Sequence, residues 1–229
     1  MALVLSLFSC KRNPSSIAVG TRPIKEYMIR DYQYVPFKYF FVDSFYRNHY
    51  EKGFSENLET FYLPQEKDIQ HLDVFISTVY NDVNAVRGIA STTPSKYDSI
   101  DITSYNQIKP IKGQLEKGYF APLIEGVDYF FDHFSHDAGF FYLKKPINNS
   151  RSVAVVYQNR EEKVGNLHAD YSGNLNDRII NLRLIKCKNM TPQNGALWKL
   201  MLKNVYEIND TTLSYPNVNI LIAYNDNGE

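Results

Sequence analysis

The chain has 229 residues, of which 44% are hydrophobic and 22% are charged, and such a chain is long enough to bury a substantial core. Its 25 Lys and Arg residues balance 25 Asp and Glu residues, so no net charge attracts nucleic acid or an anionic membrane. We therefore expect no nucleic-acid partner. The two cysteines, Cys10 and Cys187, are too few for a disulfide framework or a cysteine-rich zinc site.

The N-terminus, residues 1–10, is a short apolar segment that ends in a cysteine. Leu7-Phe8-Ser9-Cys10 resembles the end of a bacterial lipoprotein signal, whose last cysteine accepts the lipid, although no basic residue precedes the apolar run. Two interpretations stay open: Cys10 is lipidated, or the run is a core strand. The run is shorter than the ~18 apolar residues of a transmembrane helix. Residues 11–26 are mostly polar and are broken by proline and glycine, so they predict a tether.

Residues 27–112 form the first predicted β-rich module. Aromatic residues crowd positions 27–50, and core packing explains them better than a sugar or base platform, because few basic residues accompany them. Asp43-Ser44 marks the start of a short helix. Apolar runs predict strands over 37–43, 72–79 and 85–90. Prolines and glycines between 109 and 118 interrupt the pattern and mark a candidate module boundary.

Residues 113–229 form the second predicted β-rich module, a meander followed by a helix and a strand. Thr191-Pro192 is a helix-start signal, and apolar residues then recur at three- and four-residue spacing. This pattern predicts a helix over 192–208 with Trp198 on its buried face. The expected strands are 126–132 and 138–143, which form a hairpin, followed by 152–157, 178–186 and 218–224. The two modules either stay separate or pack as one unit.

The expected fold is therefore mainly β (α+β). We predict an antiparallel β-sandwich-like module with one prominent C-terminal amphipathic helix and a short N-terminal helix. After the last predicted strand, Asn225-Asp-Asn-Gly228 is a hairpin turn signal with no second strand behind it. An unpaired last strand would leave an exposed edge, so we expect the natural chain to continue past Glu229.

One cluster of metal-ligand residue types lies between the two strands of the predicted hairpin. It consists of Asp132, His133, His136 and Asp137. The alternative is a solvated turn, because no further ligand is placed by local spacing. The sequence contains neither a Gly-x-Ser-x-Gly elbow nor a glycine-rich phosphate loop. We therefore predict no catalytic residue, no cofactor and no enzyme activity.

Several motifs in the second half resemble, in their order, the SprA (Sov) family. Members of this family are giant outer-membrane proteins of Bacteroidota, linked to gliding motility and type IX secretion. The motifs are Gly126-Val-Asp-Tyr129, Val153-Ala-Val-Val-Tyr157, Val164-Gly165 and Leu197-Trp-Lys-Leu-Met-Leu-Lys-Asn-Val-Tyr206. The residues that carry the resemblance are Gly126, Asp128, Tyr129, Gly139, Leu143, Tyr157, Gly165, Leu197, Trp198, Met201, Lys203, Asn204 and Tyr206.

The resemblance implies a non-catalytic structural module of an outer-membrane protein-translocation channel. Its implied partners are the rest of the translocon barrel, other secretion-system proteins and the secreted substrates of the assembly. Its implied location is the extramembrane portion of the outer membrane, on the cell-surface or periplasmic side. The chain departs from the family in its short length and in Leu202, where a second Met is usual. The alternative function is a lipid-anchored periplasmic or cell-surface binding module.

Overall fold

The computed structural model describes residues 2–9, 25–56, 63–79, 82, 84–98, 100, 102–131, 139–166, 179–203, 205–207 and 218–224. The chain divides into two compact units. One contains residues 1–35 together with 203–229, and the other contains residues 36–202. We describe each unit by itself.

The first unit contains an open three-stranded antiparallel sheet in the order β12-β1-β2. Its strands are β1 (Ala2–Ser9), β2 (Lys25–Arg30) and β12 (Val218–Tyr224), with the short 3-10 turn η1 (Asp31–Gln33) after β2. The middle strand pairs on both sides, so Leu5 lies opposite Tyr27 of β2 and Ile222 of β12. The structure thus places residues 2–9 of the apolar N-terminal segment in a strand. Cys10 and most of the predicted tether lie outside the described residues.

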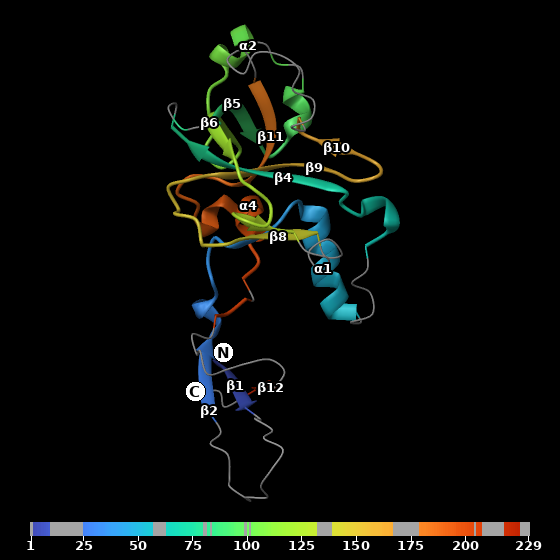
Figure 1. Cartoon of the computed structure of the whole chain (residues 1–229), viewed down its shortest axis with the longest axis vertical. Helices are drawn as coiled ribbons and strands as arrows, with labels where there is room; N and C mark the ends of the chain where they lie inside the picture. The colour runs from blue at the N-terminus through green and yellow to red at the C-terminus, as the bar shows by residue number, and fades with distance from the viewer. Residues whose placement is uncertain are drawn as a thin grey trace, which may run out of the picture. The chain divides into compact units, whose positions relative to one another are not determined.

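The second unit is built around a sheet that closes on itself. Its five strands are β4 (His71–Thr78), β5 (Val86–Ser91), β6 (Leu115–Pro122), β9 (Val153–Gln158) and β11 (Ile179–Lys186). They follow the order β9-β11-β5-β6-β4, and β4 pairs again with β9 (Figure 1). Only β5 and β11 run parallel. The two-residue strand β10 (Lys163–Val164) extends the sheet by pairing with the C-terminal end of β9.

The prediction of a mainly β fold is confirmed. The main sheet of the second unit is closed. Instead of the two facing sheets of a sandwich, five strands close into a barrel. Closure follows from β9, which meets β4 along one side and β11 along the other. Both predicted segments contribute strands to this sheet: β4 and β5 come from residues 27–112, and β6, β9 and β11 come from residues 113–229.

The sequence explains why β9 lies at the centre of this unit. Its residues Val153 to Tyr157 are at most 1% exposed, and a run of β-branched side chains is typical of a strand covered on both faces. The strand β4 instead alternates between buried and partly exposed positions over most of its length, as a strand with one wet face does. β6 was not predicted, because Lys117 and Gly118 interrupt its apolar pattern.

A second, small sheet packs aromatic side chains on both of its faces. Its order is β3-β8-β7, with strands β3 (Tyr39–Phe41), β8 (Phe140–Leu143) and β7 (Tyr129–Phe130). On one face, the Tyr142 ring stacks between Tyr39 at 5.5 Å and Phe130 at 5.2 Å, measured between ring centroids. The antiparallel pairing of β7 with β8 confirms the predicted hairpin partners.

The helices are short. They are α1 (Ser44–Glu56), α2 (Ile102–Gln107) and α4 (Gly195–Leu200), with 3-10 turns η3 (Gln65–Lys67), η4 (Pro94–Tyr97) and η7 (Pro192–Asn194). The helix α1 forms where a short N-terminal helix was predicted. Within the second unit, α1 packs against α4 and β3, and α4 packs against β11.

The C-terminal helix is much shorter than the predicted span of 192–208. It begins as a 3-10 turn after Thr191 and ends at Leu200, because Met201 adopts an extended backbone conformation. Met201 forms a bridge with Phe40, and the Leu202 N–H donates to the Tyr39 carbonyl at 3.0 Å. Pairing with β3 therefore replaces the next helical turn. Trp198 is half-buried rather than fully buried and meets the Phe37 ring edge-on.

Candidate functional site

A groove of about 520 Å³ opens on the second unit, where several strand ends meet. Ile76 of β4, Leu123 after β6 and Leu143 at the end of β8 form its apolar part. The rest of the wall comes from loop residues Val127, Asp128, Lys144, Lys145, Pro146, Ile147, Asn148 and Arg151. The volume lies within the roughly 300–1,000 Å³ range of ligand sites.

The turn before β7 forms one wall and is held by its own hydrogen bonds. The Asp128 carboxylate accepts the Ile124 N–H at 3.0 Å, and the Asp128 N–H donates to the Ile124 carbonyl at 2.8 Å. Gly126 has a φ of +76°, a conformation that side-chain-bearing residues rarely adopt, so this turn needs glycine. Its N–H donates to the Tyr129 carbonyl at 2.8 Å. The turn is thus rigid without help from a ligand.

Tyr129 anchors this wall to the closed sheet. Its side chain is buried, and the hydroxyl donates to the Leu72 carbonyl of β4 at 2.7 Å. Burial raises the pKa of the Tyr129 phenol well above its ordinary range. The phenol therefore stays protonated at neutral pH and keeps its donor role.

The opposite wall follows β8 and carries the positive charge of the groove. Lys144, Lys145 and Arg151 are exposed. The backbone beneath them is fixed, because the Lys144 N–H donates to the Asp128 carbonyl at 2.9 Å and the Ile147 N–H donates to the Phe37 carbonyl at 3.0 Å. The groove is therefore an apolar hollow beside three cations on a well-defined loop.

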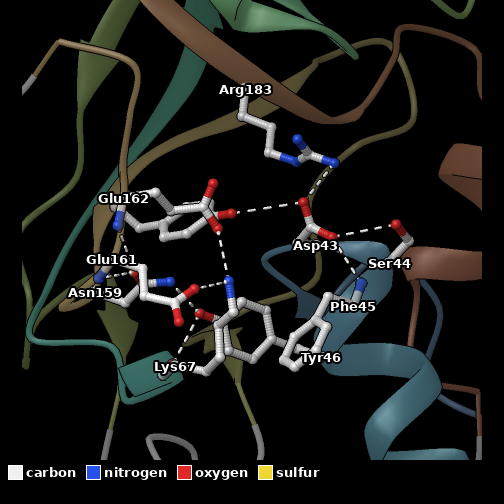
Figure 2. A network of polar contacts seen from close by, with 10 residues as sticks. Asp43, Ser44, Phe45, Tyr46, Lys67, Asn159, Glu161, Glu162 and Arg183 are labelled. Carbon is white, nitrogen blue, oxygen red and sulfur yellow. Dashed lines mark hydrogen bonds and ion pairs between the residues drawn. The ribbon is translucent and has the colours of Figure 1, made fainter. Parts of the chain in front are cut away.

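A polar network lies elsewhere in this unit, between α1 and the closed sheet (Figure 2). Arg183 of β11 meets the Asp43 carboxylate at 2.6 Å, and the other oxygen of Asp43 accepts the Phe45 N–H of α1 at 2.6 Å. Asn159 donates to the Tyr46 hydroxyl at 3.1 Å, and that hydroxyl donates to the Lys67 carbonyl at 2.9 Å.

The network ties elements together. Burial raises the pKa of Tyr46 to about 12, so its phenol stays protonated at neutral pH. The Lys67 amine lies 2.7 Å from a carboxylate oxygen of Glu161. Gly139, with a φ of +69°, packs so closely on Tyr46 that an added Cβ would come within 2.1 Å of the ring. These contacts indicate a structural role, because the charged and phenolic groups are already engaged with one another.

Lys186 of β11 is a charged side chain with no exposure to solvent. Its amine donates to the carbonyls of Asn149 at 3.1 Å, Arg151 at 2.7 Å and Cys187 at 3.1 Å. Burial lowers the pKa of the Lys186 amine to about 8, and this value still leaves the amine charged at neutral pH. The three donors of the ammonium match three carbonyls, so Lys186 fastens the 149–151 segment beneath the groove.

The structure brings together part of the predicted residue set. Asp128 and Leu143 line the groove, Tyr129 anchors its wall, and Gly126 forms its turn. Other motif residues serve packing elsewhere in the same unit: Gly139, Tyr157, Gly165, Leu197, Trp198 and Met201. Lys203 and Tyr206 belong to the first unit. Asn204 lies outside the described residues.

The proposed metal ligands Asp132, His133, His136 and Asp137 also lie outside the described residues. Among the residues that are described, no three His, Cys, Asp or Glu side chains gather in a way that would hold a metal ion. In the same part of the chain, no helix has the length and apolar character needed to span a membrane.

Sequence reasoning missed the cations of the groove and the buried Lys186. The doublet Lys144-Lys145, directly before Pro146, is a visible signal of an exposed basic turn. Lys186 gave no such signal, since its position at the end of an alternating strand is equally typical of an exposed lysine.

Comparison with known proteins adds no relative to these observations. No protein-family model matches the chain, and no curated protein matches it significantly. The resemblance to the SprA family thus rests on the motif residues alone.

Proposed function

We propose that this chain is a non-catalytic module of an outer-membrane protein-translocation assembly and that it holds a neighbouring protein through the groove. One observation carries the proposal. The motif residues Asp128 and Leu143, which are separate in the sequence, both line the groove, and the motif residue Tyr129 anchors its wall. Residues whose pattern resembles a translocon family thus shape a surface suited to binding.

The chemistry around the groove supports binding rather than reaction. Asp128 directs one carboxylate oxygen to a backbone N–H, and Tyr129 donates its proton to a backbone carbonyl. Both groups are held in place by these bonds. The assembly, its secreted substrates and the extramembrane location belong to the proposal through the family resemblance.

Site-specific photo-crosslinking in the source cells tests this function. A photoreactive amino acid replaces Val127, which is 50% exposed and lines the groove. The control replaces Ile111, which is 49% exposed and does not line the groove. We expect the Val127 position to give a covalent product with an outer-membrane secretion component, identified by mass spectrometry. Equal products from both positions, or products only with cytoplasmic proteins, would contradict the proposal.

The alternative, a lipid-anchored binding module, rests on Leu7-Phe8-Ser9-Cys10. It predicts incorporation of labelled palmitate that is lost in Cys10→Ala. Absence of label in the unaltered chain would leave the N-terminal segment as a strand of the mature protein. This experiment separates the two functions without depending on the groove.

A further inference from the structure

We propose that the groove binds an acidic, extended peptide segment. An aliphatic side chain of the peptide fills the apolar hollow, and flanking carboxylates meet Lys144, Lys145 and Arg151. This inference rests on the proposed function only for the premise that the groove holds a protein partner. It adds the chemistry of that partner.

The apolar part of the groove is the first reason. Ile76, Leu123 and Ile147 are only partly covered, and Val127 at the rim is 50% exposed. Water in contact with such a hollow is released when an apolar side chain enters it, and this release favours binding. The groove is therefore suited to an aliphatic side chain.

The charge beside the hollow is the second reason. Within the described part of the chain, Lys144, Lys145 and Arg151 form no ion pair, whereas Lys67 is paired with Glu161 and Arg47 with Glu51. The one carboxylate of the groove, Asp128, directs an oxygen to the Ile124 N–H. In a chain with equal numbers of cationic and anionic residues, these three cations are a local positive excess that attracts carboxylates.

The backbone of the groove is already held in place by hydrogen bonds before a ligand binds. Four hydrogen bonds fix its loops: Leu143 N–H to the Lys38 carbonyl, Lys144 N–H to Asp128, Ile147 N–H to Phe37 and Arg151 N–H to Asn148. A site that is already ordered loses little conformational entropy when its ligand arrives. Side chains of the three cations are then the main groups that must become ordered.

The shape favours a peptide over a membrane surface. A bilayer is contacted by apolar side chains that project from a protein, but Ile76, Leu123 and Leu143 line a hollow. A peptide that alternates acidic and aliphatic residues matches the hollow and the cations together, since an extended chain places alternate side chains on opposite sides.

Fluorescence polarisation with the purified full chain tests the inference. The probe is a short labelled peptide that alternates glutamate and leucine, and the comparison peptides alternate lysine with leucine and glutamate with serine. We expect the glutamate–leucine peptide to bind more tightly than either. In K144E/K145E its affinity should fall at least about tenfold. The matched double variant K96E/K109E, which reverses two exposed lysines outside the groove, should bind like the unaltered chain.

Melting curves establish that both double variants fold, and Arg151→Gln replaces K144E/K145E if that variant does not. Several results would overturn the inference: no binding, equal loss in both double variants, or preference for the lysine–leucine peptide. Binding to phosphatidylglycerol vesicles without binding to the peptide would also overturn it, in favour of a membrane ligand.

Because this assay uses the isolated chain, its failure leaves the Val127 crosslink unaffected. A missing crosslink with intact peptide binding would instead contradict only the proposed assembly.

Discussion

Two of the sheets, the open sheet β12-β1-β2 of the first unit and the closed sheet of the second, differ in whether they have edges. In the open sheet β12-β1-β2, as far as the chain is described, β1 alone has a partner on both sides. In the closed sheet, each of the five strands has two neighbours, and β9 can be almost completely buried. The comparison shows that closure gives every strand a partner on each side. In return, burying a polar group inside the unit costs free energy unless a partner within the protein satisfies it.

The Lys186 amine and the Asn181 amide nitrogen meet this requirement, whereas the Asn181 amide oxygen is buried without a hydrogen-bond partner in the described part of the chain. Lys186 donates to three backbone carbonyls. Asn181 is 2% exposed and donates to the Pro94 carbonyl at 2.8 Å and to Asp98 at 2.7 Å. Both side chains connect β11 to segments that carry no strand. The polar interior therefore holds the loops that surround the closed sheet.

The largest expected effect comes from removing Lys186, the buried charge of the closed unit. We expect Lys186→Ala to lower the free energy of unfolding by about 3–5 kcal/mol, because three carbonyls lose their donor and a cavity remains. Urea denaturation measures this loss. Lys199→Ala, at an exposed position of α4, is the control and should change stability by less than about 0.5 kcal/mol. A loss below about 1 kcal/mol in Lys186→Ala would show that these bonds contribute little.

The open sheet is tested through its middle strand. Leu5→Pro removes a backbone N–H from β1 and should weaken the pairing with β2 and β12 by about 2–3 kcal/mol. Hydrogen exchange should then accelerate in residues 25–30 and 218–224, with β9 and β11 unchanged because the two sheets share no strand. Leu5→Ile keeps the N–H and is the control. Unchanged exchange in both flanking strands would contradict the central position of β1.

The stability of the closed unit should also depend on pH, because Lys186 titrates. Its pKa of about 8 lies below the ordinary 10.5, so the unfolded chain binds more protons between these values and stability rises with pH. From pH 7.5 to pH 9.5, we expect the unaltered chain to gain about 2 kcal/mol relative to Lys186→Met. Urea melts across this range measure the difference between the two proteins, in which the titration of other groups largely cancels. Parallel pH curves for the two proteins would rule out the lowered pKa.

The smallest effect concerns the contact between α1 and the closed sheet. Asp43 and Arg183 are partly buried, with 16% and 18% of their side chains exposed. A double-mutant cycle with Asp43→Asn and Arg183→Gln should give a coupling energy of about 1 kcal/mol. If the loss in the double variant equals the sum of the two single losses, the pair orients its two elements but adds no measurable attraction.

The sequence predicted most of the strands and the pairing of β7 with β8, but not the strand order of the closed sheet. The β-branched run of β9 and the alternation along β4 were sufficient to find these strands. β6 was missed because Gly118 and Lys117 break its pattern, although its position between β4 and β5 makes it a strand. The helix over 192–208 was predicted too long, because periodicity cannot reveal that β3 competes for the backbone of Met201 and Leu202.

The candidate site was visible only in fragments. The Lys144-Lys145 doublet before Pro146 stands out in the sequence, since proline marks a turn. Gly126 was placed in a predicted strand over 126–132, but it lies in the turn before β7. Nothing local associates them with Ile76, which lies on a strand about fifty residues earlier in the sequence. The groove exists because β4 reaches the same place as the ends of β6 and β8.

What the sequence by itself determined is most of the extended segments and the mainly β class. These properties depend on each residue and its near neighbours, through alternation, β-branching and backbone freedom. Only the tertiary structure decided that five strands close, that the C-terminal helix stops at Leu200 and that three cations surround an apolar hollow. An alternating pattern specifies which face of a strand is buried, but long-range packing selects the strand beside it.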